Sequence, residues 1–512
     1  MLTILTLAPI QKIKYNQWLK QGLFGCVGGL GLYLITILYA QQQMGLALLF
    51  LVVFSGGLYV FISQRAYSLR YAFPAVAGIT CFIIFPLLYT VGISLTNYSG
   101  NNLLTLDKVQ DYFIQQRYID ESQRYSFKVF KQGSQLQIAL TDLFSQQQWL
   151  SNNIELDGQP KTVSIHTAQS LPAQSSLAIK DIIKLKKSLK QLTLELPNGA
   201  LLSMTGLRQF AASKSLYQLA ENDLLINNQT GEQLSPNWHT GFYENNQGEA
   251  YPPGFTVSIG LDNYTSVLFD DSVREPFIQI FVWTFVFSLL SVLFTFIVGL
   301  FLASLLQWDQ VKGKGFYRVM LILPYAVPAF ISILVFKGLF NQNAGEINLI
   351  LFQLLGIKLD WFTSPFLAKS MILLVNTWLG YPYMMLLCMG LLQSIPKDLY
   401  EASAMDGAGP LDNLFKITLP MIIKPLTPLL IACFAFNFNN FVLISLLTNG
   451  GPDIIGATTP AGTTDLLVSY TYRIAFQDSG QNFGLAAAIA TLIFLLVGAL
   501  ALAKLKLSKL EG

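Results

Sequence analysis

Asparagine side chains lie inside long apolar stretches of this chain. Asn376 is followed by Gly380 and then Tyr383 at spacings of four and three residues, which place all three on one face of a helix. An amide both donates and accepts hydrogen bonds, and an unpaired polar group in hydrocarbon is costly. These asparagines are therefore expected to face a cavity or another helix.

Two neighbouring apolar segments carry residues of the same types. Phe436, Asn437 and Asn440 lie close together in one, and Tyr325 stands between two prolines in the other. Prolines kink a helix and free its carbonyls. Amides exchange hydrogen bonds with hydroxyls and flat rings pack on C–H surfaces, so the set suits a neutral sugar. The candidate binding residues are Tyr325, Asn376, Leu379, Gly380, Tyr383, Phe436, Asn437 and Asn440.

The alternative is that these residues only hold helices together, as Asn and small residues do in membranes. Gly380 would let a ligand approach the backbone, and the clustering of the set on consecutive segments favours a pocket. Asn439 would point away from Asn437 and Asn440 on a continuous helix. We therefore assign Asn439 to packing.

A polar loop at residues 393–420 is expected to contain a short helix that ends in glycines. Asp398 is expected to cap a short helix over 399–406, which Gly407 and Gly409 end because glycine adopts left-handed conformations cheaply. The small side chains of Ala402 and its neighbours make a slim surface that could seat in a groove of a partner.

Several kinds of chemistry have no residues to support them. The chain has no G-x-x-x-x-G-K-[ST] phosphate loop, so ATP hydrolysis, if used, belongs to another chain. Its four cysteines lie singly in apolar stretches, and His166 and His239 are isolated, so no metal site, cofactor or catalytic residue is expected. We expect a protein that is not an enzyme.

The composition indicates a membrane protein. Of 512 residues, 53% are hydrophobic and 12% charged, with a mean hydropathy of +0.48, whereas soluble domains carry about 25% charged residues. The net charge is +3, without a long basic run, so nucleic acid is not an expected partner. Eight apolar segments are long enough to span a bilayer: 21–40, 44–63, 72–95, 277–306, 317–340, 366–392, 421–446 and 483–503.

The distribution of basic residues predicts the orientation of these spans. Lysines and arginines precede the first span, follow the last and lie in alternate loops between them, which puts both termini in the cytoplasm. The first apolar run is long for a signal peptide, and Leu38-Tyr39-Ala40 is a poor cleavage site. We expect a retained anchor.

The chain divides into three parts: 1–95 with three spans, a polar insert at 96–276, and 277–512 with five spans. Alternating stretches at 125–130, 162–165 and 191–196 predict strands. Residues 177–192 read as an amphipathic helix with Ile179, Ile182, Ile183 and Leu185 on one side. The insert is expected to be a compact, strand-rich domain outside the membrane, on an otherwise all-α protein.

The loop at 393–420 resembles the EAA loop of permeases in ABC importers, the binding-protein-dependent transport inner-membrane component family. Glu401, Ala402 and Gly407 fall at the spacing of EAA-x-x-x-G, and Ile417, Leu419 and Pro420 follow as I-x-LP. Ser403 replaces the second alanine. The resemblance implies docking on an ATPase through Glu401, Ala402, Ser403, Asp406 and Gly407.

Within that family, the chain resembles permeases of maltose and maltodextrin importers. The shared features are the eight spans, the large insert after the third span, and the runs at 376–383, 437–444 and 447–453. The likeness is dense over 317–503 and weaker in the insert. It implies that the candidate binding residues form a sugar pocket; a related sugar, such as trehalose or a glucoside, remains open.

The resemblance also implies partners. These are a second permease subunit, two ATPase subunits that hold ATP and Mg²⁺, a periplasmic maltose-binding protein, maltose or maltodextrin, and the lipid of a bacterial inner membrane. The implied mechanism is alternating access driven by ATP on the partner. An ion-coupled carrier is the alternative: the predicted spans contain no Asp, Glu or His, but backbone carbonyls also bind sodium.

Overall fold

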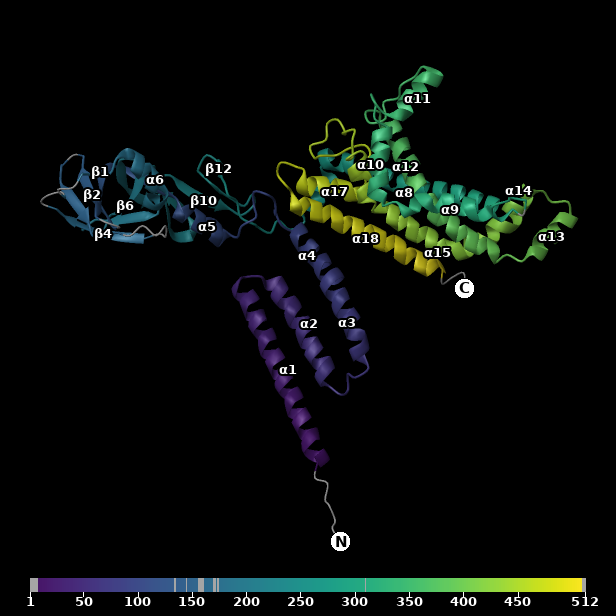
Figure 1. Ribbon diagram of the computed structural model, residues 1–512, viewed down its shortest axis with the longest axis horizontal. Helices are drawn as coiled ribbons and strands as arrows, with labels where there is room; N and C mark the ends of the chain where they lie inside the picture. Colours follow the sequence, from purple (N-terminus) through teal and green to yellow (C-terminus); the bar gives the residue numbers. More distant parts are fainter. Residues whose placement is uncertain are drawn as a thin grey trace, which may run out of the picture. The chain divides into compact units, whose positions relative to one another are not determined.

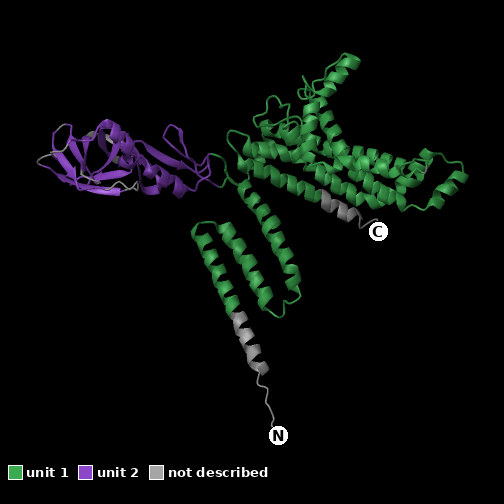
Figure 2. Ribbon diagram, viewed as in Figure 1, with its two compact units in different colours: residues 1–100, 258–512 green, residues 101–257 purple. Residues whose placement is uncertain are grey.

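The computed structural model describes residues 8–132, 135–143, 145–154, 161–168, 172, 175–308 and 310–508 (Figure 1). These residues form two compact units, a helical one of residues 1–100 and 258–512 and a strand-rich one of residues 101–257 (Figure 2). The expectation placed the insert at 96–276. Residues 262–269 and 271–276, however, already form helix in the helical unit.

The N-terminal helices form apolar rods. They are α1 (Ala8–Ala40), α2 (Met44–Ile62), α3 (Leu69–Ile79), the π-helical turn η1 (Thr80–Ile84) and α4 (Phe85–Ser94). The helical run from Leu69 to Ser94 has a mean hydropathy of 2.2 in its most apolar window, and none of that window is buried within the chain. Apolar side chains that the chain leaves unburied suit contact with lipid or another subunit.

The rest of the helical unit follows the insert. Its helices are α7 (Asp262–Phe269), α8 (Asp271–Gln307), α9 (Lys314–Ala326), α10 (Ala329–Leu339), α11 (Glu346–Leu355), α12 (Pro365–Gln393), α13 (Lys397–Met405), α14 (Pro410–Asp412), the π-helical turn η3 (Asn413–Thr418), α15 (Leu419–Phe438), α16 (Phe441–Leu447), α17 (Leu467–Phe476) and α18 (Phe483–Ser508). Helix α8 packs along α12 and α15. Close approach of α8 to α12 depends on Gly299, where an added Cβ would lie 2.8 Å from the backbone nitrogen of Met385.

Two of the predicted spans are broken. The segment 317–340 divides into α9 and α10, which meet at an angle of 89°. The break falls at Val327-Pro328, because Pro328 lacks the N–H that would continue the ladder. The segment 421–446 divides into α15 and α16 at Asn439-Asn440. The kink expected from the prolines in 317–340 is confirmed and is a sharp break, whereas the expectation of one continuous helix over 421–446 was wrong.

Six described helical segments are long and apolar enough to cross a membrane, and the bent pair α9–α10 would make a seventh. Helix α18 carries the last apolar stretch, described as Phe483–Ala499. All of these match predicted segments. The number eight itself stays a prediction.

The insert contains a closed barrel and a small sheet. The barrel runs in the order β1 (Arg117–Gln132), β2 (Gln135–Asp142), β3 (Gln148–Ser151), β4 (Lys161–Thr167), β5 (Leu192–Glu195), β6 (Leu201–Gly206) and β7 (Gln209–Ser215). The sheet is β8 (Tyr217–Leu219), β9 (Leu225–Asn227), β10 (Gln233–Asn237), β11 (Phe242–Glu244) and β12 (Ala250–Tyr251), with α5 (Leu106–Gln115) and the turn η2 (Glu221–Asp223) nearby in sequence. The three predicted strand stretches lie in β1, β4 and β5.

The predicted amphipathic helix is α6 (Ile179–Lys190), which connects the parallel pair β4 and β5. It buries Ile182 and Leu189 in the barrel core and packs Leu185 against that core. Ile179 and Ile183 are exposed, so the predicted apolar face was rotated from the real one. The buried face follows the spacing of Ile182, Leu185 and Leu189, at i, i+3 and i+7.

Candidate functional site

Three asparagines from two spans meet in one hydrogen-bonded cluster. On α12, Asn376 donates from Nδ2 to Oδ1 of Asn437 on α15 at 2.7 Å. Its own Oδ1 accepts from Nδ2 of Asn440 at 3.3 Å. Asn376 and Asn437 are buried and Asn440 is half-buried. The structure therefore brings together the three amides that the sequence singled out.

The position of Asn440 depends on the break after α15. Its side chain caps α16, where Oδ1 accepts the N–H of Leu443 at 3.3 Å. The Asn440 side chain thus accepts a hydrogen bond from the first turn of α16 through Oδ1 and donates one to Asn376 through its NH₂ group. Asn439 is exposed, and its side chain donates to the Ala435 carbonyl at 3.2 Å, so it lies outside the cluster as expected and its role in packing stays a prediction.

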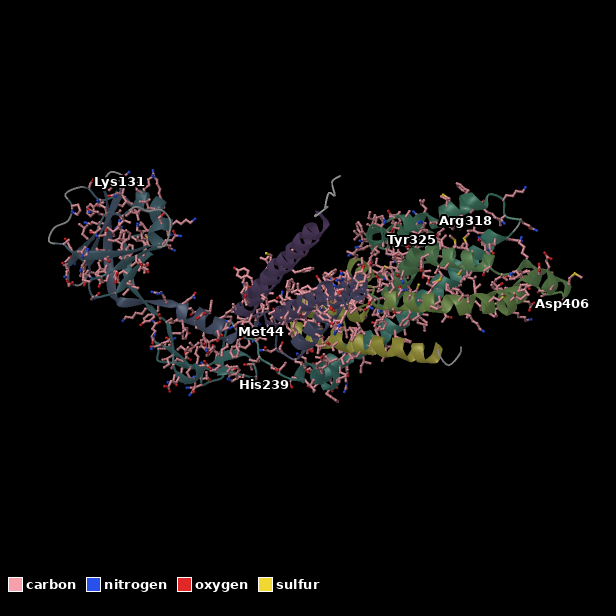
Figure 3. All side chains as sticks on the ribbon, turned by 90° about the horizontal axis from the view of Figure 1, so that it is seen from below. Met44, Lys131, His239, Arg318, Tyr325 and Asp406 are labelled. Atoms are coloured by element: carbon pink, nitrogen blue, oxygen red, sulfur yellow. The ribbon has the colours of Figure 1, made fainter. Side chains whose placement is uncertain are left out.

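The aromatic members of the set are exposed. Phe436 is 72% exposed, and Tyr325 and Tyr383 are also on the surface. Figure 3 shows Tyr325 on α9. Exposed rings suit one wall of a site whose other wall lies outside the described residues. They also suit contact with lipid, so exposure alone does not define a pocket.

Leu379 and Gly380 lie on the packing side of α12. Leu379 packs against the core of Trp283, Phe287 and neighbouring residues. An added Cβ at Gly380 would come within 2.8 Å of the Thr295 methyl group on α8. The glycine therefore permits close approach of two helices, which differs from the expected approach of a ligand to the backbone.

An apolar groove of about 760 Å³ lies between α8, α9 and α12. Phe294, Trp378 and Tyr381 are among its lining residues, and the amide cluster contributes nothing to the wall. A groove with so few polar groups does not suit a sugar. The apolar groove therefore adds no residue to the candidate binding set.

The loop predicted to contact a partner forms a helix and a tight turn. Helix α13 ends at Met405, and the turn after it passes through Gly407, whose φ of +80° favours glycine. Asp398 lies in the first turn behind the N-cap residue Pro396 and makes no capping hydrogen bond, so the expected cap was wrong. Gly409 has an ordinary φ of −82° and begins α14, so it does not end the helix.

The turn is fastened to α13 by two side-chain contacts. Ser403 donates to Oδ1 of Asn413, and the hydroxyls of Tyr400 and Thr418 lie 2.9 Å apart. An alanine at 403 could not make the first contact. This contact gives a structural reason for serine in place of the second alanine of the EAA motif. Glu401, Ala402 and Asp406 remain exposed, and Asp406 lies at the tip of the helical unit (Figure 3).

Apolar side chains flank this loop and were missed from the sequence. Met405 is 88% exposed, and Leu411 and Phe415 are also largely exposed. Large apolar groups on a polar loop mark contact surfaces. The sequence could have indicated this surface, because Met405, Leu411 and Phe415 are large apolar residues in a stretch that also carries charged residues.

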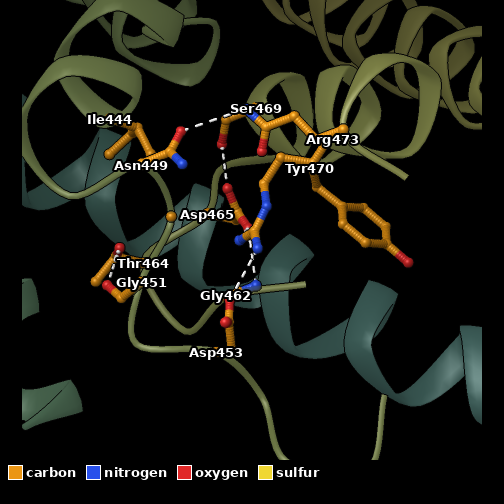
Figure 4. A network of polar contacts seen from close by, with 12 residues as sticks. Ile444, Asn449, Gly451, Asp453, Gly462, Thr464, Asp465, Ser469, Tyr470 and Arg473 are labelled. Atoms are coloured by element: carbon orange, nitrogen blue, oxygen red, sulfur yellow. Dashed lines mark hydrogen bonds and ion pairs between the residues drawn. The ribbon is translucent and has the colours of Figure 1, made fainter. Parts of the chain in front are cut away.

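A buried ion pair after α16 was also missed. The carboxylate of Asp465 accepts from Arg473 Nη1 at 2.8 Å, Ser469 Oγ at 2.8 Å and the Gly462 N–H at 2.7 Å (Figure 4). Burial raises the pKa of the Asp465 carboxyl, against the opposing effect of the Arg473 charge and the hydrogen bonds. The signal was two charges, eight residues apart, in a stretch with no others between Asp453 and Asp478.

Among the residues that the structure describes, no group of His, Cys, Asp and Glu is arranged to hold a metal ion. The amide cluster itself consists of neutral groups that donate and accept hydrogen bonds. Such a site can pass a polar, uncharged solute through a membrane.

The helical unit with its broken spans, amide cluster and exposed α13 turn defines a membrane permease subunit. Residues 296–506 match the family model of the binding-protein-dependent transport system inner membrane component. Residues 104–260 match the P2 domain, and residues 18–65 the N-terminal transmembrane helices, of maltose transport system permease proteins.

Curated relatives agree along almost the whole chain. The chain is 54% identical over 486 residues to the maltose/maltodextrin transport system permease protein MalF of Klebsiella aerogenes, covering 94% of each protein. It is 51% identical to MalF of Salmonella typhimurium, covering 98% of this chain and 99% of that one. The chain belongs to the MalF family. It is therefore a multi-pass inner-membrane component of an ABC importer, and a transporter rather than an enzyme.

Proposed function

We propose that this chain carries maltose and maltodextrins across the inner membrane as one permease subunit of an ATP-driven importer. The observation that supports this most strongly is the match to MalF proteins over more than nine-tenths of both chains. None of the relatives or family models supports the ion-coupled alternative.

The sugar site in this proposal is the asparagine cluster with its rings. Asn376, Asn437 and Asn440 now hydrogen-bond to one another, and a sugar hydroxyl can replace either contact at little net cost because amides donate and accept. Phe436, Tyr325 and Tyr383 supply faces for the C–H surface of the sugar. Leu379 and Gly380 support this wall from behind through their packing.

A second permease subunit, MalG-like, would complete the site. Its presence would cover the exposed rings and apolar helix surfaces of this chain. Two MalK-like ATPase subunits would bind ATP and Mg²⁺, so this chain would need no cofactor and no ATP site. The periplasmic maltose-binding protein would deliver the sugar, with the insert outside and both termini in the cytoplasm.

Coupling to ATP would pass through α13. Glu401, Ala402 and Asp406 form its exposed surface, Gly407 sets the turn, and Ser403 fixes that turn to η3. Closure of the ATPase pair would move α13, and the connected helices would open the site outward. Hydrolysis would return it to the inward-facing state.

The experiment that tests this proposal is ATP hydrolysis by the purified complex in proteoliposomes, with and without maltose-loaded binding protein. We expect strong stimulation by the loaded protein. An ATPase that co-purifies but ignores maltose would retain the importer and reopen the choice of sugar. No co-purifying ATPase and no stimulation would contradict the proposal.

A further inference from the structure

The short helix α16 connects the amide cluster to a tightly folded loop, residues 448–466. At its first end, Asn440 caps the helix and donates to Asn376. At its second end, the Ile444 carbonyl accepts the N–H groups of Thr448 at 3.1 Å and Asn449 at 2.7 Å. A helix of two turns is rigid, so its second end helps to set where Asn440 lies.

The loop is attached to this second end by hydroxyl contacts. The Oγ1 atoms of Thr448 and Thr464 lie 2.9 Å apart, and Thr464 also donates to the Gly451 carbonyl at 2.7 Å. Leu466 packs in the same core as Ile444 and Leu447 of α16. The residue that follows Thr464 is Asp465.

Asp465 fixes the loop to α17. Its side chain is completely buried and paired with Arg473, which is itself only 11% exposed and reaches Asp453 with Nη2 at 2.8 Å. Figure 4 shows this network around Arg473. Asp453 is 76% exposed, so one arginine has a buried and an exposed partner.

The backbone around the pair leaves little freedom. An added Cβ at Gly450 would lie 2.3 Å from Oδ1 of Asp465, and one at Gly462 would lie 2.0 Å from the Gly450 carbonyl oxygen. Gly450 also has a φ of +82°, which disfavours other residues. The loop is therefore built closely around the Asp465 carboxylate.

Burial of this pair is not explained by stability alone. Well-packed apolar side chains often replace buried ion pairs at no cost or with a gain in stability, whereas ion pairs with several hydrogen bonds fix a geometry. We propose that the Asp465–Arg473 pair is a positioning element for sugar transport, which holds α16 so that Asn440 meets Asn376 at the sugar site. This inference rests on the proposed sugar site.

The test uses the complete importer in proteoliposomes with saturating maltose-loaded binding protein. The readout is maltose transported per ATP hydrolysed, with ATP hydrolysis normalised to the amount of assembled complex. A purely structural defect lowers the amount of complex and leaves this ratio unchanged. A misplaced amide lowers the ratio, because ATP is hydrolysed while sugar is not taken up.

Four variants separate the outcomes: Asp465→Asn, the matched control Asp453→Asn, Asn440→Ala at the sugar site, and the double variant Asp465→Leu with Arg473→Met. We expect Asp465→Asn and Asn440→Ala to lower the ratio by at least about fivefold. The control at the exposed carboxylate is expected to keep the wild-type ratio. If Asp465→Asn prevents assembly of the complex, the double variant tests the inference in its place. We expect the double variant to assemble and to transport little maltose per ATP.

A wild-type ratio in Asp465→Asn, or in the assembled double variant, would overturn the inference while Asn440→Ala still lowered the ratio. An equal loss in Asp453→Asn would also overturn it, because the buried carboxylate would have no distinct role. A wild-type ratio in Asn440→Ala would instead contradict the proposed sugar site, on which the inference depends.

Discussion

At the scale of single residues, Asn376 is the centre of the site because it contacts both other amides. Replacement by alanine removes both hydrogen bonds. If the amide also binds sugar, Asn376→Ala lowers maltose uptake per assembled complex by at least about fivefold, as expected for a lost hydrogen bond. Uptake of radiolabelled maltose, normalised to complex detected by immunoblotting, measures this.

The control for this prediction is Asn439→Ala, since Asn439 is exposed and outside the cluster. We expect uptake close to wild type. If Asn376→Ala reduced only the amount of complex and left uptake per complex unchanged, the asparagines would serve to join helices, and the sugar site would have to lie elsewhere.

Gly407 is the second residue with a sharp prediction. A valine there would adopt a left-handed conformation at a cost of about 1–2 kcal/mol, which distorts the turn after α13. We expect Gly407→Val to assemble partly and to transport little maltose per ATP. Gly409→Ala is the matched control, because its φ is ordinary and the nearest side-chain atom to an added Cβ is 3.8 Å away.

Normal uptake by Gly407→Val would count strongly against coupling through this turn. The sequence indicated Gly407 correctly, because a left-handed helix end has a simple residue preference. It did not indicate the contact between Ser403 and Asn413, since that depends on the π-helical turn that follows.

At the scale of elements, the contact of α8 with α12 depends on the absence of a side chain at Gly299. Gly299→Val would push against the backbone at Met384 and Met385 and cost about 1–3 kcal/mol by overpacking. We expect a lower midpoint of thermal unfolding for the purified complex. Gly390→Val, on α12 with nothing within 4 Å of its added Cβ, is the control; equal midpoints for the two would contradict this packing.

In the insert, α6 is held in the barrel core by Leu189, which is fully buried. Leu189→Ala should cost about 2–5 kcal/mol through lost burial and a cavity. Hydrogen exchange of the barrel amides in the intact chain measures this as faster opening. The exposed Ile183→Ala should leave hydrogen exchange unchanged. Faster exchange in Ile183→Ala with unchanged exchange in Leu189→Ala would instead indicate that α6 packs through the face predicted from the sequence.

The accuracy of the sequence predictions follows from the range of the interactions. The apolar runs predicted the spans correctly, because a run of apolar residues is visible within a short stretch of sequence. The break at Asn440 was missed because asparagine can also sit inside a helix, and only its contacts with Asn376 and Leu443 make it a cap. Closure of the barrel requires β1 to pair with β7, almost one hundred residues later, which a local pattern does not reveal.

At the scale of the whole molecule, we propose that this chain supplies a path and a coupling surface while other chains supply energy and delivery. Its exposed rings, the exposed surface of α13 and much of the apolar N-terminal helices are left uncovered by the described residues. The Asp465–Arg473 pair lies outside these surfaces. It acts within the chain, and the sequence alone did not connect it to the site because the connection runs through α16.

We propose that ATP drives maltose through this chain. The most direct measurement is uptake of radiolabelled maltose into proteoliposomes that contain the whole complex, with loaded binding protein outside and ATP inside, in the presence and absence of ionophores. We predict uptake that requires ATP and the binding protein and is unchanged when ion gradients are collapsed. Uptake that persists without ATP and disappears with the ion gradient would contradict this account.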